Sequence, residues 1–258
     1  MEVHQHTHTP RKKWTHYLWE FLMLFLAIFC GFLAENKREH IVEQQREKRF
    51  MKNMLEDLTR DTASIERHAF FQKRAVLFSD SLVTSINSPG RNDHLKDIYY
   101  YVRILSIFNP FFYSNATISQ LKNSGSLRLI GKGSVADSII QYDMWAQRML
   151  AVEGNIETVI GNFRACMGNL IDAQVIKSMI DTSLLTGTGP ARGNFIKRPL
   201  LNYPLISDDK KNINQLCMYA DFLLTLYQYQ FKNMETQKER AIRLIKLLKK
   251  EYRLNNKE

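Results

Sequence analysis

Proline and glycine are scarce in this chain, with 6 Pro and 11 Gly among 258 residues. From Glu35 to about Ile86 neither occurs, so no residue in this stretch breaks a helix. Cysteine is also rare, which excludes a small domain held by many disulfides. We expect Cys166 and Cys217 to be buried free thiols. The alternative is a disulfide bond between them, if the domain lies outside the cytoplasm. Cys30 falls in an apolar run.

The sequence lacks a catalytic signature. Histidines that could act as bases or metal ligands are scattered: His4, His6, His8, His40, His68 and His94. No carboxylate or cysteine completes a metal set with the alternating histidines near the start. The glycine-rich stretch 187–193 follows no strand, so it does not predict phosphate binding. The sequence therefore predicts a protein that is not an enzyme and needs no cofactor or metal.

One long apolar run is present, from Tyr17 to Ala34. Its 18 residues contain a single charged residue, Glu20, and at about 1.5 Å per residue they just cross a hydrocarbon core of roughly 30 Å. Trp14 and Trp19 suit the headgroup layer. The sequence predicts an uncleaved transmembrane anchor over residues 14–34. A lipoprotein signal cut before Cys30 is an alternative, but bulky residues precede that cysteine.

The chain is basic and rich enough in apolar residues to fold. There are 36 Lys and Arg against 26 Asp and Glu, a net charge of +10, and 45% of residues are hydrophobic. This composition predicts a folded core after the anchor rather than disorder. The basic surface favours membrane lipids or acidic protein partners. No nucleic-acid-binding motif accompanies the charge, so we expect no nucleic acid partner.

The pattern of apolar residues predicts an all-α fold. We expect a polar tail (1–13), a single transmembrane helix (14–34) and a long antiparallel helical bundle (35–258). The first and last helices of the bundle are predicted at about 35–87 and 208–254, with helices near 94–108, 114–125 and 134–182 between them and a loop at 183–206. A capping box of Ser134 and Asp137 opens the third of these, and Gly154 and Gly161 are expected to bend or split it.

Two apolar stripes in steps of four and three residues support the bundle. The first stripe runs from Leu58 to Ile86, where Gln72 and Ser79 interrupt it, and the second runs from Ile213 to Tyr252. The two long helices have similar lengths, so an antiparallel pair is expected. This pairing would return the basic C-terminal end to the membrane side.

Two candidate association sites emerge. Small residues on one face of the anchor favour close helix–helix contact, with a carboxyl at one end of that face. The members of this face are Glu20, Leu24, Ala27, Gly31 and Ala34. An aromatic group follows the first long helix, either as a partner or ligand surface or as the core of the bundle's far end. The members of this group are Tyr99, Tyr100, Tyr101, Phe111, Phe112 and Tyr113, with Phe108 beside them.

The N-terminal sequence also resembles that of other proteins. The run HTHTPRKKWTHYLWEFLMLFLAIFCGFLAEN, followed by EDL at Glu56–Leu58, resembles an uncharacterised family of single-pass membrane-anchored helical proteins of Bacteroidota. The stretch SQLKNSGSLRLI (Ser119–Ile130) resembles segments of similar short proteins. The resemblance implies a bacterial envelope protein, but it implies no activity and no functional residues.

Orientation is judged from the basic residues flanking the anchor. Three precede it, at 11–13, and six follow within 20 residues, but long domains follow the positive-inside rule less strictly. We expect an inner (cytoplasmic) membrane protein with its N-terminus inside and its bundle in the periplasm. The leading functional hypothesis is a membrane-tethered scaffold or assembly protein that binds a protein partner or a second copy. The alternative is a ligand-sensing bundle that signals through a membrane partner.

Overall fold

The structure is a computed structural model that describes residues 14–181 and 196–254. Eight helical segments occur in these ranges. They are α1 (Trp14–Ile86), η1 (Arg91–His94), α2 (Leu95–Leu105), α3 (Ala116–Asn123), η2 (Ser126–Leu129), α4 (Gly133–Met167), α5 (Ala173–Ser178) and α6 (Lys210–Tyr252). Within the described ranges there is no strand, only an isolated bridge between Ile180 and Ile196. The predicted all-α fold is confirmed.

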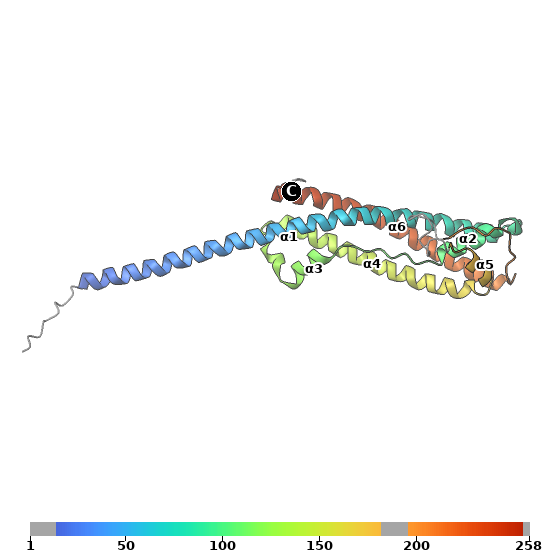
Figure 1. The fold of residues 1–258 in the computed structure, drawn as a ribbon, viewed down its shortest axis with the longest axis horizontal. Helices are drawn as coiled ribbons and strands as arrows, with labels where there is room; N and C mark the ends of the chain where they lie inside the picture. The colour runs from blue at the N-terminus through green and yellow to red at the C-terminus, as the bar shows by residue number, and fades with distance from the viewer. Residues whose placement is uncertain (1–13, 182–195, 255–258) are drawn as a thin grey trace, which may run out of the picture. The chain divides into compact units, whose positions relative to one another are not determined.

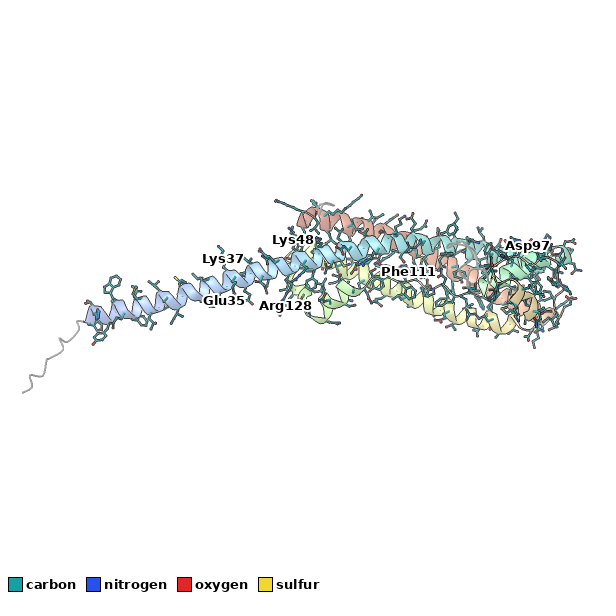
Figure 2. All side chains as sticks on the ribbon, viewed as in Figure 1. Glu35, Lys37, Lys48, Asp97, Phe111 and Arg128 are labelled. Carbon is teal, nitrogen blue, oxygen red and sulfur yellow. The ribbon has the colours of Figure 1, made fainter. Side chains whose placement is uncertain are left out.

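The chain divides into two compact units, one up to Phe50 and one from Met51 onward. In the first unit, the described residues 14–50 form the start of α1, and every side chain from Trp14 to Val42 is exposed. Figure 2 shows the side chains of this part, with Glu35, Lys37 and Lys48 labelled. In the described parts of the chain, α1 is the one helix long and apolar enough to cross a membrane.

The second unit is built on α1, α4 and α6 (Figure 1). The direction of each helix follows from its contacts. Tyr142 on α4 meets Asp61 on α1, and further along Glu153 meets Gln72, so α1 and α4 run parallel. Helix α6 runs antiparallel to both. Its later residues lie beside the earlier parts of the other two helices, as in the pairs Lys238–Glu66 and Gln237–Tyr142.

The ends of the long helices follow local chemistry. Helix α1 stops at Ile86, separated by one residue from Ser88-Pro89-Gly90, as the sequence predicts. Helix α6 begins after Asp209, whose carboxylate accepts hydrogen bonds from the backbone N–H groups of Lys211 and Asn212. Figure 1 shows α2 and α5 toward one end of this unit and α3 toward the other.

The prediction of one helix over 134–182 was wrong. Helix α4 ends at Met167. Helix α5 begins at Ala173, and Asp172 caps its N-terminus by accepting a hydrogen bond from the backbone N–H of Gln174. Leu170 and Ile171, in the break between the two helices, are both buried in the core. Gly154 and Gly161 do not split α4, because both lie on its exposed face with open space around them.

The expected capping box also does not open α4. The helix begins at Gly133, and the residue before it, Lys132, makes no side-chain cap. The buried stripe of α6 differs from the predicted one in about half of its positions: Leu216, Leu223, Gln230, Gln237 and Leu244 are buried, whereas Leu224, Phe231, Lys238 and Ile245 are only half-buried. This shift places two glutamines in the interior.

Candidate functional site

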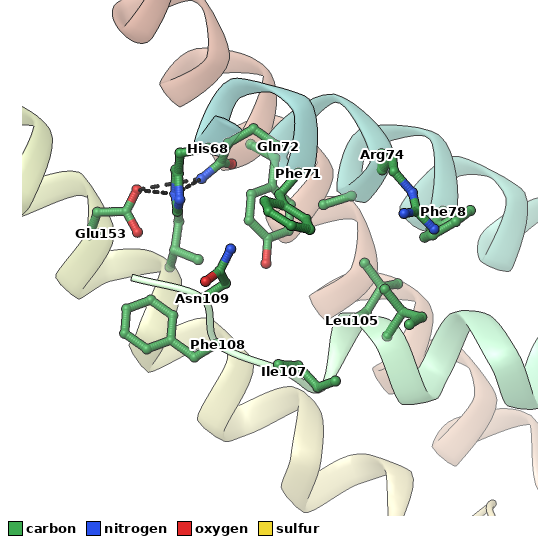
Figure 3. Close-up of a pocket in the computed structure, with 14 residues that line it drawn as sticks. His68, Phe71, Gln72, Arg74, Phe78, Leu105, Ile107, Phe108, Asn109 and Glu153 are labelled. Atoms are coloured by element: carbon green, nitrogen blue, oxygen red, sulfur yellow. Dashed lines mark hydrogen bonds and ion pairs between the residues drawn. The ribbon is translucent and has the colours of Figure 1, made fainter. Parts of the chain in front are cut away.

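A partly open cavity of about 400 Å³ lies in the second unit, between α1, α4, α6 and the segment after α2 (Figure 3). Its walls are mainly apolar and aromatic. The lining residues are His68, Phe71, Gln72, Arg74, Ala75, Phe78, Ile104, Leu105, Ile107, Phe108, Asn109, Glu153, Ile156 and Tyr227. A cavity of this size and character is typical of small-molecule sites.

The cavity occurs where polar residues take core positions on all three long helices. On α1, His68 and Gln72 are one turn apart and follow the buried Ile65. On α4, Glu153 stands between the buried Met149 and Ile156. On α6, Gln230 occupies the equivalent position, and it is fully buried. The four polar residues, here called the Glu153 cluster, are therefore brought together by the same periodicity that builds the core.

One oxygen of Glu153 receives all the hydrogen bonds that reach this carboxylate. Its Oε1 accepts from Gln230 Nε2 at 2.8 Å and from Gln72 Nε2 at 3.4 Å, and it lies 3.4 Å from His68 Nε2. The dashed lines in Figure 3 mark the contacts with His68 and Gln72. Two of these donors have second partners. Gln230 Nε2 also donates to the carbonyl of Met149 at 3.0 Å, and Gln72 Nε2 lies 3.0 Å from His68 Nε2.

Three acceptors of the cluster have no partner among the described residues. They are Oε2 of Glu153 and the Oε1 atoms of Gln72 and Gln230. Glu153 is 4% exposed and His68 is 6% exposed. A buried carboxylate with one unpartnered oxygen is costly, because the desolvation of that oxygen is not offset by a hydrogen bond. The Glu153 cluster is therefore incomplete as a purely structural network.

A second group of buried carboxylates in the same unit provides a comparison. Asp57 accepts from Arg60 and the backbone N–H of Thr117. Asp61 accepts from the backbone N–H of Ser114 and the hydroxyl of Tyr142. All four of these carboxylate oxygens have a partner.

Asp143 completes this aspartate network. One of its oxygens accepts from the Tyr113 hydroxyl and the other pairs with Lys122. Burial raises the pKa of the Asp61 carboxyl, and its hydrogen bonds from Ser114 and Tyr142 oppose that shift. The aspartate network fastens the segment around α3 to α1 and α4, which is a structural role. The Glu153 cluster differs from it in its unpartnered oxygen.

Aromatic and cationic groups complete the cavity wall. The guanidinium of Arg74 lies 5.2 Å from the ring centre of Phe78, and in Figure 3 Arg74 and Glu153 lie at opposite sides of the cavity. Burial raises the pKa of the Tyr227 hydroxyl, and the charge of Glu153 adds to the shift. Tyr227 therefore stays a neutral hydroxyl at the wall.

Half of the six residues of the predicted aromatic surface lie in the interior. Tyr99, Tyr100 and Phe111 are buried; Phe111 is labelled in Figure 2. The hydroxyl of Tyr99 donates to the carbonyl of Pro204 and accepts from the N–H of Asp172.

The other three predicted aromatic residues are more accessible. Tyr101 and Tyr113 are half-buried, and Phe112 is 74% exposed. None of the six predicted residues lines the cavity, although Phe108 beside them does. The alternative that the sequence left open, a core role, describes the positions of Tyr99, Tyr100 and Phe111.

The predicted membrane face lies along α1 in the first unit. Glu20, Leu24, Ala27, Gly31 and Ala34 are all exposed, and no atom lies within 4 Å of a side chain added at Gly31. The imidazole of His16 lies 3.0 Å from the carboxylate of Glu20. The histidines at 4, 6 and 8 and the glycine-rich stretch 187–193 lie outside the described residues.

His68 and Glu153 were not predicted as a pair, because the histidines are scattered along the sequence. The available signal was spacing: His68 falls on the line Asp61, Ile65, His68, Gln72, which has core periodicity. Cys166 and Cys217 are free and buried, as expected, and burial raises the pKa of both thiols. In the described part of the chain, no group of three or more His, Cys, Asp or Glu is placed to hold a metal ion.

Comparison with protein-family models, curated proteins and solved structures gave no match. The resemblance to a Bacteroidota family therefore stays a prediction.

Proposed function

We propose that the second unit is a ligand-binding bundle, and that the cavity beside Glu153 is its binding site. The observation that carries this proposal is a buried carboxylate with an unpartnered oxygen, on a residue that lines a largely apolar cavity of about 400 Å³. A ligand in the cavity would contact α1, α4 and α6 together. Binding would favour the packing of these helices that fits the ligand, and a protein partner would read the change. No catalytic step is part of this role.

The test is a thermal-shift screen of the full chain in lipid nanodiscs. A ligand present at a hundred times its Kd stabilises the folded state by about 2.7 kcal/mol, which corresponds to at least about 5 °C in Tm for a domain of this size. Ala75→Trp fills the cavity and should abolish the shift. Ala63→Trp, on an exposed position of the same helix, should keep it. An equal loss in both variants, or no shift with any compound, would refute the binding site.

A second role, association through the first unit, is favoured by the exposed small-residue face of α1. Gly31 has open space around it, and Ala27 and Gly31 have the spacing that lets two helices approach closely. We propose that this face binds a second copy or another membrane protein, as a scaffold would. Gly31→Leu should abolish crosslinking between anchors in a membrane, whereas Phe29→Leu on another face should not. Unchanged crosslinking of the Gly31 variant would remove this role.

We also propose that residues 14–34 span the inner membrane and that the bundle lies in the periplasm, in contact with membrane lipids and a protein partner. Basic residues before the anchor support this orientation. Fusion of the C-terminus to alkaline phosphatase should give an active enzyme. Fluorescence from a fused protein that matures only in the cytoplasm would reverse the orientation.

A further inference from the structure

The chemistry of the cavity defines a ligand class, an inference that rests on the proposed binding function. We propose that the cavity takes an organic amine: a protonated nitrogen beside Glu153 and an aromatic or aliphatic body between the rings of the wall. Two of the unpartnered polar atoms, Glu153 Oε2 and Gln72 Oε1, belong to residues that line the cavity, and both are acceptors. A ligand group that satisfies both must be a donor.

Charge selects among donors. Among the described residues, the group beside Glu153 that can become positive is His68, whose Nε2 lies 3.4 Å from Oε1, the oxygen that already has partners. An ammonium group carries several N–H donors and a positive charge, so beside Glu153 it would supply a donor to the cluster and offset the buried carboxylate. A hydroxyl would supply one hydrogen bond and no charge. A carboxylate ligand would be repelled.

The rest of the wall suits the body of such an amine. Phe71, Phe78, Phe108 and Tyr227 supply aromatic surface, and aromatic faces attract cations as well as apolar groups. Arg74, the permanent cation of the lining, stacks on Phe78, across the cavity from Glu153 in Figure 3. The positive end of a ligand would therefore be drawn toward Glu153 and away from Arg74.

Three matched probes test the inference on the full chain in lipid nanodiscs: phenethylamine, phenethyl alcohol and hydrocinnamate, which share a phenyl body and differ in the polar group. Binding is measured by titration calorimetry. The expected result is that phenethylamine binds at least about tenfold more tightly than either other probe, since a hydrogen bond to a charged group contributes about 1.5–3 kcal/mol. Glu153→Gln, which keeps the shape, should remove this preference. Glu157→Gln, one turn further along on the exposed face of α4, should retain it.

The outcomes separate the ligand class from the binding site. If phenethyl alcohol or hydrocinnamate binds as tightly as the amine, or if the preference survives in Glu153→Gln, the amine assignment is overturned while the cavity remains a binding site. If titration shows no binding of any of the three probes, both the amine assignment and the proposed function are overturned.

Discussion

Replacing Glu153 by methionine should leave the free protein as stable as before or make it more stable. The reason is that no hydrogen-bond donor loses its last partner. Without the carboxylate, Gln230 Nε2 still donates to the Met149 carbonyl at 3.0 Å. Gln72 Nε2 still lies 3.0 Å from His68 Nε2, which accepts when the ring proton is on Nδ1. The methionine also removes the unpartnered Oε2.

Two contributions set the expected change in the free energy of unfolding of Glu153→Met. Replacing a buried ionic group by an apolar one of similar size is often neutral or stabilising by about 1–4 kcal/mol, and burying a methionine side chain contributes about 1.5–3 kcal/mol relative to leaving it exposed. Lost contact with His68 opposes both. We therefore expect a change in the free energy of unfolding between zero and about 3 kcal/mol in the stabilising direction.

The assay is reversible denaturant unfolding in nanodiscs, followed by far-ultraviolet circular dichroism. Glu157→Met serves as the control, and as an exposed substitution it should change stability by no more than about 0.5 kcal/mol. A loss of more than about 2 kcal/mol in Glu153→Met would refute the reasoning, because breaking a needed buried pair costs about 3–5 kcal/mol. Glu153 would then be structural, like the aspartates.

Three further predictions use the same measurement. Asp61→Ala should destabilise by about 2–4 kcal/mol, because the Ser114 N–H and the Tyr142 hydroxyl lose their acceptor, and a change below about 1 kcal/mol would contradict this. Asp61→Asn should make stability less dependent on pH: burial raises the folded-state pKa of Asp61, so in the native protein its contribution is full below the unfolded pKa and is lost as pH rises through the folded one. A variant with an unchanged pH profile would oppose that assignment. Gly125→Ala should cost about 1 kcal/mol, because Gly125 has a φ of +65°; an unchanged midpoint would show that the turn relaxes.

Periodicity predicted the long helices but not the residues that lie inside the fold. The absence of Gly and Pro and the Ser88-Pro89-Gly90 stop were enough to place the end of α1, and the regular stripe was enough to place α6. The interior face of α6 depends on which of two adjacent positions turns inward, such as Gln230 or Phe231. Both fit steps of four and three, so only packing against α4 decides between them.

The candidate site was missed for a related reason. Glu153 and His68 are 85 positions apart, and nothing local links them. Each is a polar residue on a stripe of core spacing, and the sequence cannot tell a buried polar group from an interruption of the stripe. The aromatic group is the opposite case, since the sequence left open whether it is a surface or part of the core. Tyr99 and Phe111 are conspicuous in sequence, but their rings are needed to fill the interior of the second unit.

The antiparallel course of α6 has a consequence for how this protein is made. The contact between Lys238 and Glu66 joins residues 172 positions apart, and the apolar stripes of α1 and α4 have no cover from α6 until it is synthesised. Contacts so distant in sequence form late. The nascent chain therefore exposes the face of α1 that α6 will cover, and later that of α4, until α6 is made. During this period, binding by a chaperone or prompt docking on a partner would protect the chain from aggregation.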